Sequence, residues 1–227
     1  MQVSKIKDLL ADYKMLLQQG RVPLDLHLWE AQKVFQDNWD VDAPDFADMY
    51  SRAINSKETQ RYWKDRQYQP KQMMELFLKM ETPWVKSMFD DLLNEERGIE
   101  ARVGRFLFLM DETLNQYRSK HPLSIDTNHH HGDYRMISLY LSFRYPEKYA
   151  YYVHEDFTHF LKVVNSPKIP LVPDFVRFCK VAKIIYTFME KDQELITTFQ
   201  HNLLPSIHYT GENRMIVFDF LRSRTFL

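Results

Sequence analysis

Apolar residues recur at intervals of three and four along most of the chain, which is the spacing that lines one face of an α-helix. The pattern is clearest in the middle, where residues 73–78, 85–93 and 99–117 each present such a stripe. Further stripes cover residues 6–17, 29–35, 46–54, 137–143, 149–164, 175–189, 195–204 and 215–221. No segment alternates apolar and polar residues over the length of a strand. The pattern therefore predicts an all-α fold of about ten to twelve helices.

Glycine and proline residues fall almost entirely where these helices are expected to begin or end. Pro83 precedes one of the central stripes, in the first helical turn where proline is tolerated. Either Asp42 or Asp45 is placed to cap the helix that begins at Phe46. Gly104 alone lies inside a predicted helix, where a glycine costs about 1 kcal/mol. We therefore expect another helix to cross it at short range.

A chain of 227 residues can bury a substantial core, and we expect one globular domain over residues 1–227. An alternative organisation packs a smaller N-terminal subdomain, residues 1–68, on a core of residues 69–227. One departure from the all-α fold is also open. Residues 207–209 and 214–218, on either side of a Thr-Gly turn, could pair as a small β-hairpin near the C-terminus.

Charge and cysteine content exclude several classes of protein. Thirty Lys and Arg residues against 31 Asp and Glu give a net charge of −1, so a surface for nucleic acid must be a local patch. The single cysteine, Cys179, excludes a disulfide scaffold. No apolar run approaches the roughly 20 residues of a membrane span, and no signal-peptide pattern is present. We expect a soluble, cytoplasmic protein without membrane contacts, and the sequence does not indicate an oligomeric state.

The chain carries no recognisable catalytic motif. It has no phosphate-binding loop, no dinucleotide fingerprint and no nucleophile elbow, and its five glycines are too few and too scattered to build them. We therefore expect a protein that is not an enzyme and that holds no cofactor.

A polar loop at residues 119–132 interrupts the helical pattern and ends in three consecutive histidines. Long loops in compact domains are often functional. His129, His130 and His131, with Asp133 beside them, are weak candidates for a metal site, since imidazole and carboxylate groups are common ligands of transition metals. The alternative is a solvated loop in which one histidine caps a helix or meets Asp133.

Basic and aromatic residues gather directly after this loop. The candidate nucleic-acid-binding residues are Arg135, Arg144, Tyr145, Lys148, Tyr149 and Tyr152. A similar cluster occurs earlier and consists of Arg61, Trp63, Lys64, Arg66 and Tyr68. Cationic groups could neutralise phosphates while rings stack on exposed bases. The same residue types also dominate protein interfaces, and Tyr149 and Tyr152 could instead be packing residues.

Two segments carry a family resemblance. Residues 85–96, continuing to Phe106, and residues 137–149 resemble segments in the N-terminal regions of McrB-like restriction ATPases. The resemblance implies the recognition module of a nucleotide-driven type IV restriction system, with an AAA+ motor or nuclease subunit as partner. The chain lacks the Walker A loop of such a motor, so motor and nuclease activities are not implied. It is expected to be a separated domain, a truncated relative or a fragment of a larger protein.

The leading hypothesis is thus a non-catalytic recognition or specificity domain of a restriction-type defence system that binds DNA. One alternative is a helical protein-interaction or oligomerisation module without nucleic-acid contact. A second is a metal-dependent phosphohydrolase centred on His130, His131 and Asp133.

Overall fold

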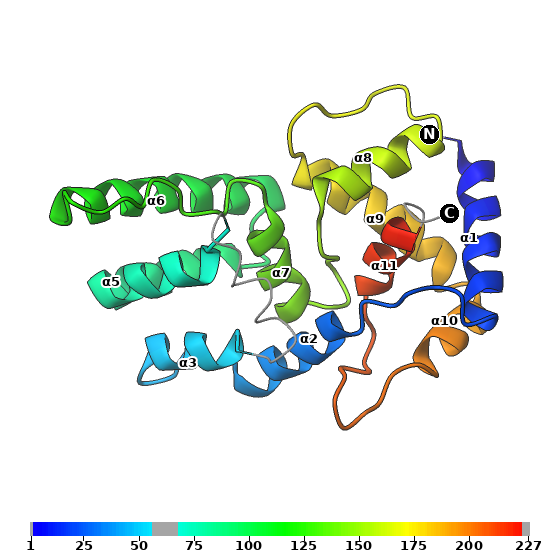
Figure 1. Ribbon diagram of the computed structural model, residues 1–227, viewed down its shortest axis with the longest axis horizontal. Coiled ribbons are helices and arrows are strands. Elements are labelled where there is room, and N and C mark those ends of the chain that lie inside the picture. The colour runs from blue at the N-terminus through cyan, green and yellow to red at the C-terminus, as the bar shows by residue number, and fades with distance from the viewer. Residues whose placement is uncertain (1, 56–67, 224–227) are drawn as a thin grey trace. The chain divides into compact units, whose positions relative to one another are not determined.

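The computed structural model describes residues 2–55 and 68–223 and confirms the all-α prediction. Within these residues the chain forms ten helices and no strand (Figure 1). The helices are α1 (Val3–Gln18), α2 (His27–Asn38), α3 (Phe46–Ala53), α5 (Pro70–Leu92), α6 (Ile99–Lys120), α7 (Arg135–Arg144), α8 (His154–Val163), α9 (Phe175–Met189), α10 (Gln193–Gln200) and α11 (Met215–Ser223). None of these helices combines the length and the apolar character that crossing a bilayer requires.

The chain divides into two compact units. Unit 1 comprises Met1–Trp29 and Ser138–Leu227, and unit 2 comprises Glu30–Ile137. The division points lie inside α2 and α7, so both connections between the units are helical. The N-terminal subdomain considered above, residues 1–68, contains parts of both units.

Unit 2 is built on α5 and α6, which lie side by side, with α3 packed on α5 (Figure 1). Helix α5 is kinked at Glu81, whose backbone is non-helical, and Pro83 lies two residues after the kink. Phe89 is central to the core, because its ring contacts those of Trp39, Phe46, Tyr50 and Phe106 at centroid distances of 5.3–5.9 Å. Asp45 caps α3 by accepting a hydrogen bond from the Asp48 amide, as the sequence predicted.

Unit 1 is built around α11, which contacts α1, α8 and α9. Its residues from Met215 to Leu221 are all buried, so the helix is apolar around its whole circumference except at Asp219. The Tyr13 hydroxyl of α1 donates a hydrogen bond of 2.6 Å to that carboxylate. A polar group this deep is expected to be hydrogen-bonded, and this one ties two helices together.

Two predictions about local structure are wrong. The β-hairpin near the C-terminus does not form, because residues 215–218 belong to the start of α11, where an element apolar on nearly every side is buried as a helix. Among the residues that the structure describes, no other helix closely approaches Gly104. A Cβ atom built there would have no neighbour within 4 Å, so Gly104 lies in open space on α6.

Candidate functional site

Three of the residues expected to bind nucleic acid form a compact group in unit 1, which we call the cationic turn: Arg144, Tyr145 and Lys148. Arg144 is the last residue of α7, and the chain then turns, with the Lys148 and Tyr149 amides donating hydrogen bonds of 3.0 and 3.1 Å to the Tyr145 carbonyl. The Arg144 guanidinium lies 5.0 Å and the Lys148 ammonium 5.2 Å from the centre of the Tyr145 ring. Both cations are exposed and the ring is half-buried.

Arg214, which precedes α11, fixes the cationic turn to the rest of unit 1. Its amide donates a hydrogen bond of 2.8 Å to the Pro146 carbonyl, and its guanidinium donates to the Lys148 carbonyl. The same guanidinium lies 5.2 Å from the centre of the Tyr186 ring on α9. The turn is therefore attached to Arg214 through its own backbone carbonyl groups.

Tyr149 and Tyr152 are core residues, so their proposed role in stacking on bases is corrected. Tyr149 is only 8% exposed and Tyr152 is fully buried. The Tyr152 ring packs against Phe157, Phe175 and Phe178, and its hydroxyl accepts a hydrogen bond of 3.0 Å from the Asp174 amide at the start of α9. Burial makes both rings inaccessible to a base, and the packing role considered as the alternative is the one they have.

Arg135 belongs to unit 2, where it interacts with residues close to it in that unit. Its guanidinium pairs with the Asp133 carboxylate at 2.6 Å and lies 3.8 Å from the centre of the Tyr68 ring. Asp133 also accepts a hydrogen bond of 3.0 Å from the Arg135 amide. The contacts described for Arg135 thus lie within unit 2, whereas the cationic turn belongs to unit 1. The other members of the earlier basic cluster, Arg61, Trp63, Lys64 and Arg66, lie outside the described residues.

The histidine loop folds inward rather than lying in solvent, which corrects the solvated-loop expectation for His129 and His131. Both are buried. The His131 amide donates to His129 Nδ1 at 3.1 Å, so a neutral His129 ring carries its proton on Nε2 and donates it to Asp111 at 3.0 Å. His131 Nδ1 in turn donates to the His129 carbonyl at 2.5 Å. Burial lowers the pKa of His131 to about 3, so this ring is neutral.

These contacts give the histidine loop a structural role. His130 has different contacts from the other two histidines, because its ring packs against Tyr68 with centroids 5.8 Å apart. Partial burial lowers the pKa of His130. Asp133 is used by Arg135, as described above. Within residues 2–55 and 68–223, no three His, Cys, Asp or Glu side chains are grouped in a way that could hold a metal ion.

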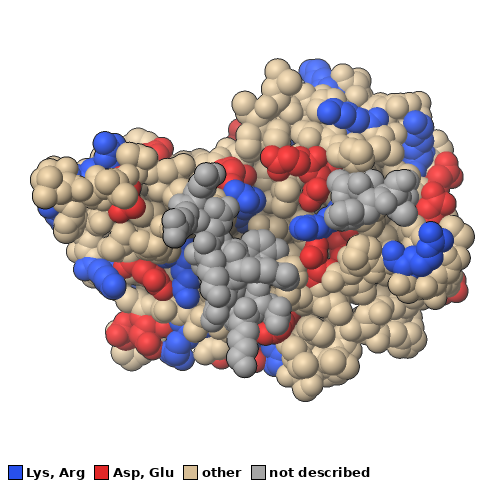
Figure 2. Space-filling view, viewed as in Figure 1, with Lys and Arg blue, Asp and Glu red and all other residues tan. Residues whose placement is uncertain are grey.

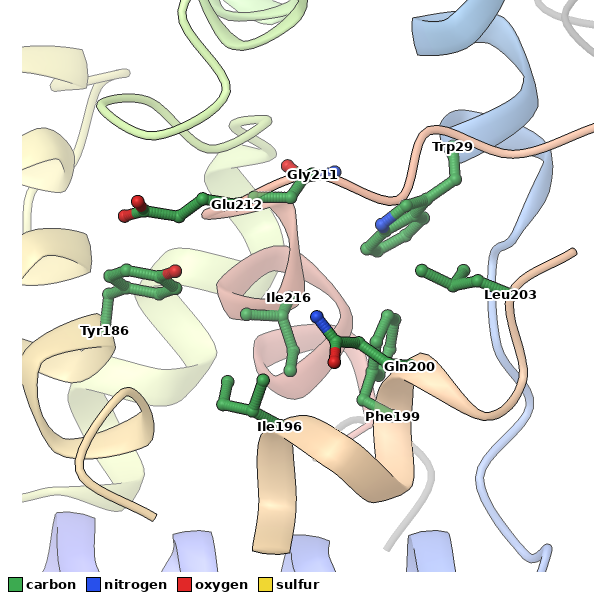
Figure 3. A pocket seen from close by; sticks show the side chains of 10 residues that line it. Trp29, Tyr186, Ile196, Phe199, Gln200, Leu203, Gly211, Glu212 and Ile216 are labelled. Atoms are coloured by element: carbon green, nitrogen blue, oxygen red, sulfur yellow. The ribbon is translucent and has the colours of Figure 1, made fainter. Parts of the chain in front are cut away.

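A cavity that the sequence did not indicate lies within unit 1, between α9, α10 and the start of α11 (Figure 3). Its volume is about 240 Å³. The lining residues are Trp29, Tyr186, Ile196, Phe199, Gln200, Leu203, Gly211, Glu212, Asn213 and Ile216. These residues are spread over almost 190 positions of the sequence. The hairpin expected from residues 207–209 and 214–218 gave no indication that Gly211 to Ile216 would line a cavity.

Figure 2 shows Lys and Arg interspersed with Asp and Glu on the face in view, without a large area of one sign. Comparisons with known protein families, with curated proteins and with solved structures return no match.

Proposed function

We propose that this protein is a non-catalytic recognition domain that binds DNA through the cationic turn. The observation that carries the proposal is the grouping of two exposed cations, Arg144 and Lys148, within 5.2 Å of one half-buried aromatic ring. Arg144 and Lys148 are suited to contact successive phosphates, and the accessible edge of Tyr145 is suited to contact a sugar or a base. Because the backbone of the turn is already fixed by hydrogen bonds, binding would cost little backbone conformational entropy.

The same segment carries the resemblance to McrB-like restriction ATPases, since residues 137–149 include all three residues of the cationic turn. On this proposal the chain serves a restriction-type defence system as its specificity component. An AAA+ motor or a nuclease subunit would then act on the DNA that this domain has bound. The resemblance supplies the biological setting, and the cationic turn supplies the contact.

Two phosphate contacts place the proposed interaction in the weak, salt-sensitive range. Each neutralised phosphate releases condensed counterions, and non-specific binding of this kind has Kd values of about 10⁻⁴ to 10⁻⁶ M at physiological salt. Tighter binding would require contacts to a particular base or modification in addition to the turn. The proposal therefore predicts measurable binding at low salt and a further gain on the cognate DNA.

Fluorescence anisotropy with labelled duplexes tests the proposal. Arg144→Ala combined with Lys148→Ala is expected to weaken binding at 50 mM salt at least tenfold, to both modified and unmodified duplexes. The matched control removes two exposed lysines of α9, Lys180→Ala with Lys183→Ala, and is expected to change affinity less than threefold. Absence of binding by the wild-type protein, or equal losses in the two double variants, would refute the cationic turn as the DNA contact.

One observation favours a second candidate function, protein interaction. Leu171 and Val172, in the segment between α8 and α9, are 95% and 70% exposed. Exposed apolar groups of this kind are used in protein interfaces. If the protein associates through this segment, Leu171→Ser with Val172→Ser should shift its mass to the monomer in light scattering or abolish capture of a motor subunit. Unchanged association in both assays would remove this candidate.

A further inference from the structure

The cavity in unit 1 is large enough for a small organic molecule. A cavity of about 150 Å³ can hold benzene, and this one measures about 240 Å³. Three of its lining residues, Gln200, Gly211 and Glu212, are exposed, so the cavity opens to solvent at their end. The others are buried or half-buried and form its walls. The cavity is thus a preformed recess with one accessible side.

Aromatic rings supply much of the wall. The rings of Trp29 and Phe199 contact each other with centroids 5.1 Å apart, and Tyr186 lies across the cavity from them (Figure 3). Side chains of Ile196 and Ile216 lie between these two groups. The face of an aromatic ring carries partial negative charge and attracts cations, most strongly when the cation is desolvated. Among Trp, Tyr and Phe, tryptophan gives the strongest attraction.

The polar end of the cavity is acidic. The Glu212 side chain lies at the same end of the cavity as Tyr186 (Figure 3). The pKa of Tyr186 is raised to about 12, chiefly by burial and then by the negative charges of Glu212 and Glu190, while the Arg214 guanidinium lowers it. Glu212 is the charged residue among those that line the cavity. A cation at this end would therefore meet a carboxylate next to aromatic surface.

We propose that this cavity binds a small organic cation with a methylated ammonium head group. Glu212 provides the opposite charge at the mouth, and Trp29 and Phe199 provide the aromatic surface, since the Tyr186 ring already has the Arg214 guanidinium 5.2 Å from its centre. A methylated head group fits better than a primary ammonium, because the apolar walls offer few acceptors for N–H groups and methyl groups carry a smaller desolvation cost. The site is separate from the cationic turn, so the proposal extends beyond DNA binding.

Chemistry of this kind occurs both in free metabolites and in methylated lysine side chains. Choline and tetramethylammonium represent the first source, and a short peptide with one trimethyl-lysine represents the second. Binding can be followed by NMR of the tryptophan indole signals in the intact protein. Tighter binding of the peptide than of choline would identify a protein side chain as the ligand, and equal or weaker binding would identify a free cation.

The decisive comparison is between choline and 3,3-dimethylbutan-1-ol, which has the same shape without the charge. We expect choline to bind at least tenfold more tightly. Equal affinity would overturn the proposal, because it would show that only apolar contact is involved. Failure of every cation to shift the indole signals at concentrations up to tens of millimolar would overturn it as well.

Variants locate the binding in this cavity. Glu212→Gln removes the charge from an exposed side chain, so folding should be retained, and it is expected to weaken choline binding at least fivefold while leaving the alcohol unaffected. Glu190→Gln is the matched control, since Glu190 is near Tyr186 but does not line the cavity, and should cost less than twofold. Equal effects of the two variants would contradict the proposal. Arg144→Ala with Lys148→Ala should leave choline binding unchanged, which separates this site from the DNA contact.

Discussion

At the scale of single residues, Asp219 has the most unusual environment. It is buried in α11, and its carboxylate accepts hydrogen bonds from the Tyr13 hydroxyl and the Asp25 amide. Burial raises the pKa of Asp219 to about 6, which the hydrogen bonds from Tyr13 and Asp25 only partly oppose. The folded protein therefore holds this proton more strongly than the unfolded chain does.

Because the pKa of Asp219 is raised in the folded state, the free energy of unfolding is expected to fall as the pH rises. Asp219 contributes stability below pH 4, where both states are protonated, and that contribution is lost as the pH rises through about 6. A shift of this size corresponds to roughly 2–3 kcal/mol. The free energy of unfolding of the wild type, relative to Asp219→Asn, should fall by that amount between pH 4 and pH 7 in urea titrations.

A second variant makes the assignment specific. Tyr13→Phe removes a donor that favours the ionised carboxylate, so the pKa of Asp219 should rise and the loss of stability should move to higher pH. Parallel pH profiles for the wild type and Asp219→Asn would contradict the account of this residue.

At the scale of helices, Gly104 of α6 is expected to be a site where stability can be gained. Its surroundings are open, so Gly104→Ala adds a methyl group without a clash and should stabilise the protein by about 0.5–1 kcal/mol. Gly20, just after α1, has φ +63°, a left-handed conformation in which a side chain is strained. Gly20→Ala should therefore destabilise by about 1 kcal/mol. Thermal unfolding midpoints that move in the same direction for both variants would rule out this explanation.

Arg102 joins the start of α6 to the end of α5. Its side chain is 2% exposed, and Nη1 donates hydrogen bonds of 2.7 Å to both the Leu92 carbonyl and the Glu95 carboxylate. Arg102→Ala should destabilise the protein by about 2–4 kcal/mol, because it leaves both acceptors without this donor. Arg105, three residues further along, pairs with Asp91 at 3.2 Å but is 62% exposed.

The matched variant Arg105→Ala should cost no more than about 0.5 kcal/mol, since exposed ion pairs contribute little. Urea denaturation of the two variants provides the comparison. Similar free energies of unfolding for Arg102→Ala and Arg105→Ala would show that burial of the first guanidinium has no energetic consequence.

Helices were predictable from the sequence because each buries one face, and that face repeats every three or four residues. The stripe with Val85, Met88 and Phe89 therefore predicted α5 well, and Pro83 marked the segment after its bend. Contacts between distant elements leave no such period. The burial of Tyr152 depends on α8 and α9, the inward fold of His129 depends on Asp111, and neither partner can be inferred from nearby residues.

The candidate sites were predictable to different extents for the same reason. Arg144, Tyr145 and Lys148 are neighbours in sequence, so a single turn brings them together, and their grouping was anticipated. The cavity combines Trp29 with residues 186–216, which only the packing of unit 1 brings together. Sites within one turn can be inferred from residue types, whereas sites between elements require the fold.

At the scale of the whole molecule, the net charge of −1 means that attraction to DNA must come from particular side chains. General electrostatic attraction would be spread over the 30 Lys and Arg residues, and removal of any two would have similar effects. If DNA binds through the cationic turn, removal of Arg144 and Lys148 alone should reduce the affinity. Diffuse attraction and binding through the turn therefore differ in how these two substitutions change the salt dependence of the affinity.

The most direct test is therefore the slope of log K against log salt concentration for a DNA duplex. If Arg144 and Lys148 each neutralise one phosphate, the slope of the double alanine variant should be shallower than that of the wild type by about 2. Lys180→Ala with Lys183→Ala should leave the wild-type slope unchanged. Equal slopes for the wild type and the Arg144 and Lys148 variant would contradict the claim that this protein binds DNA through the cationic turn.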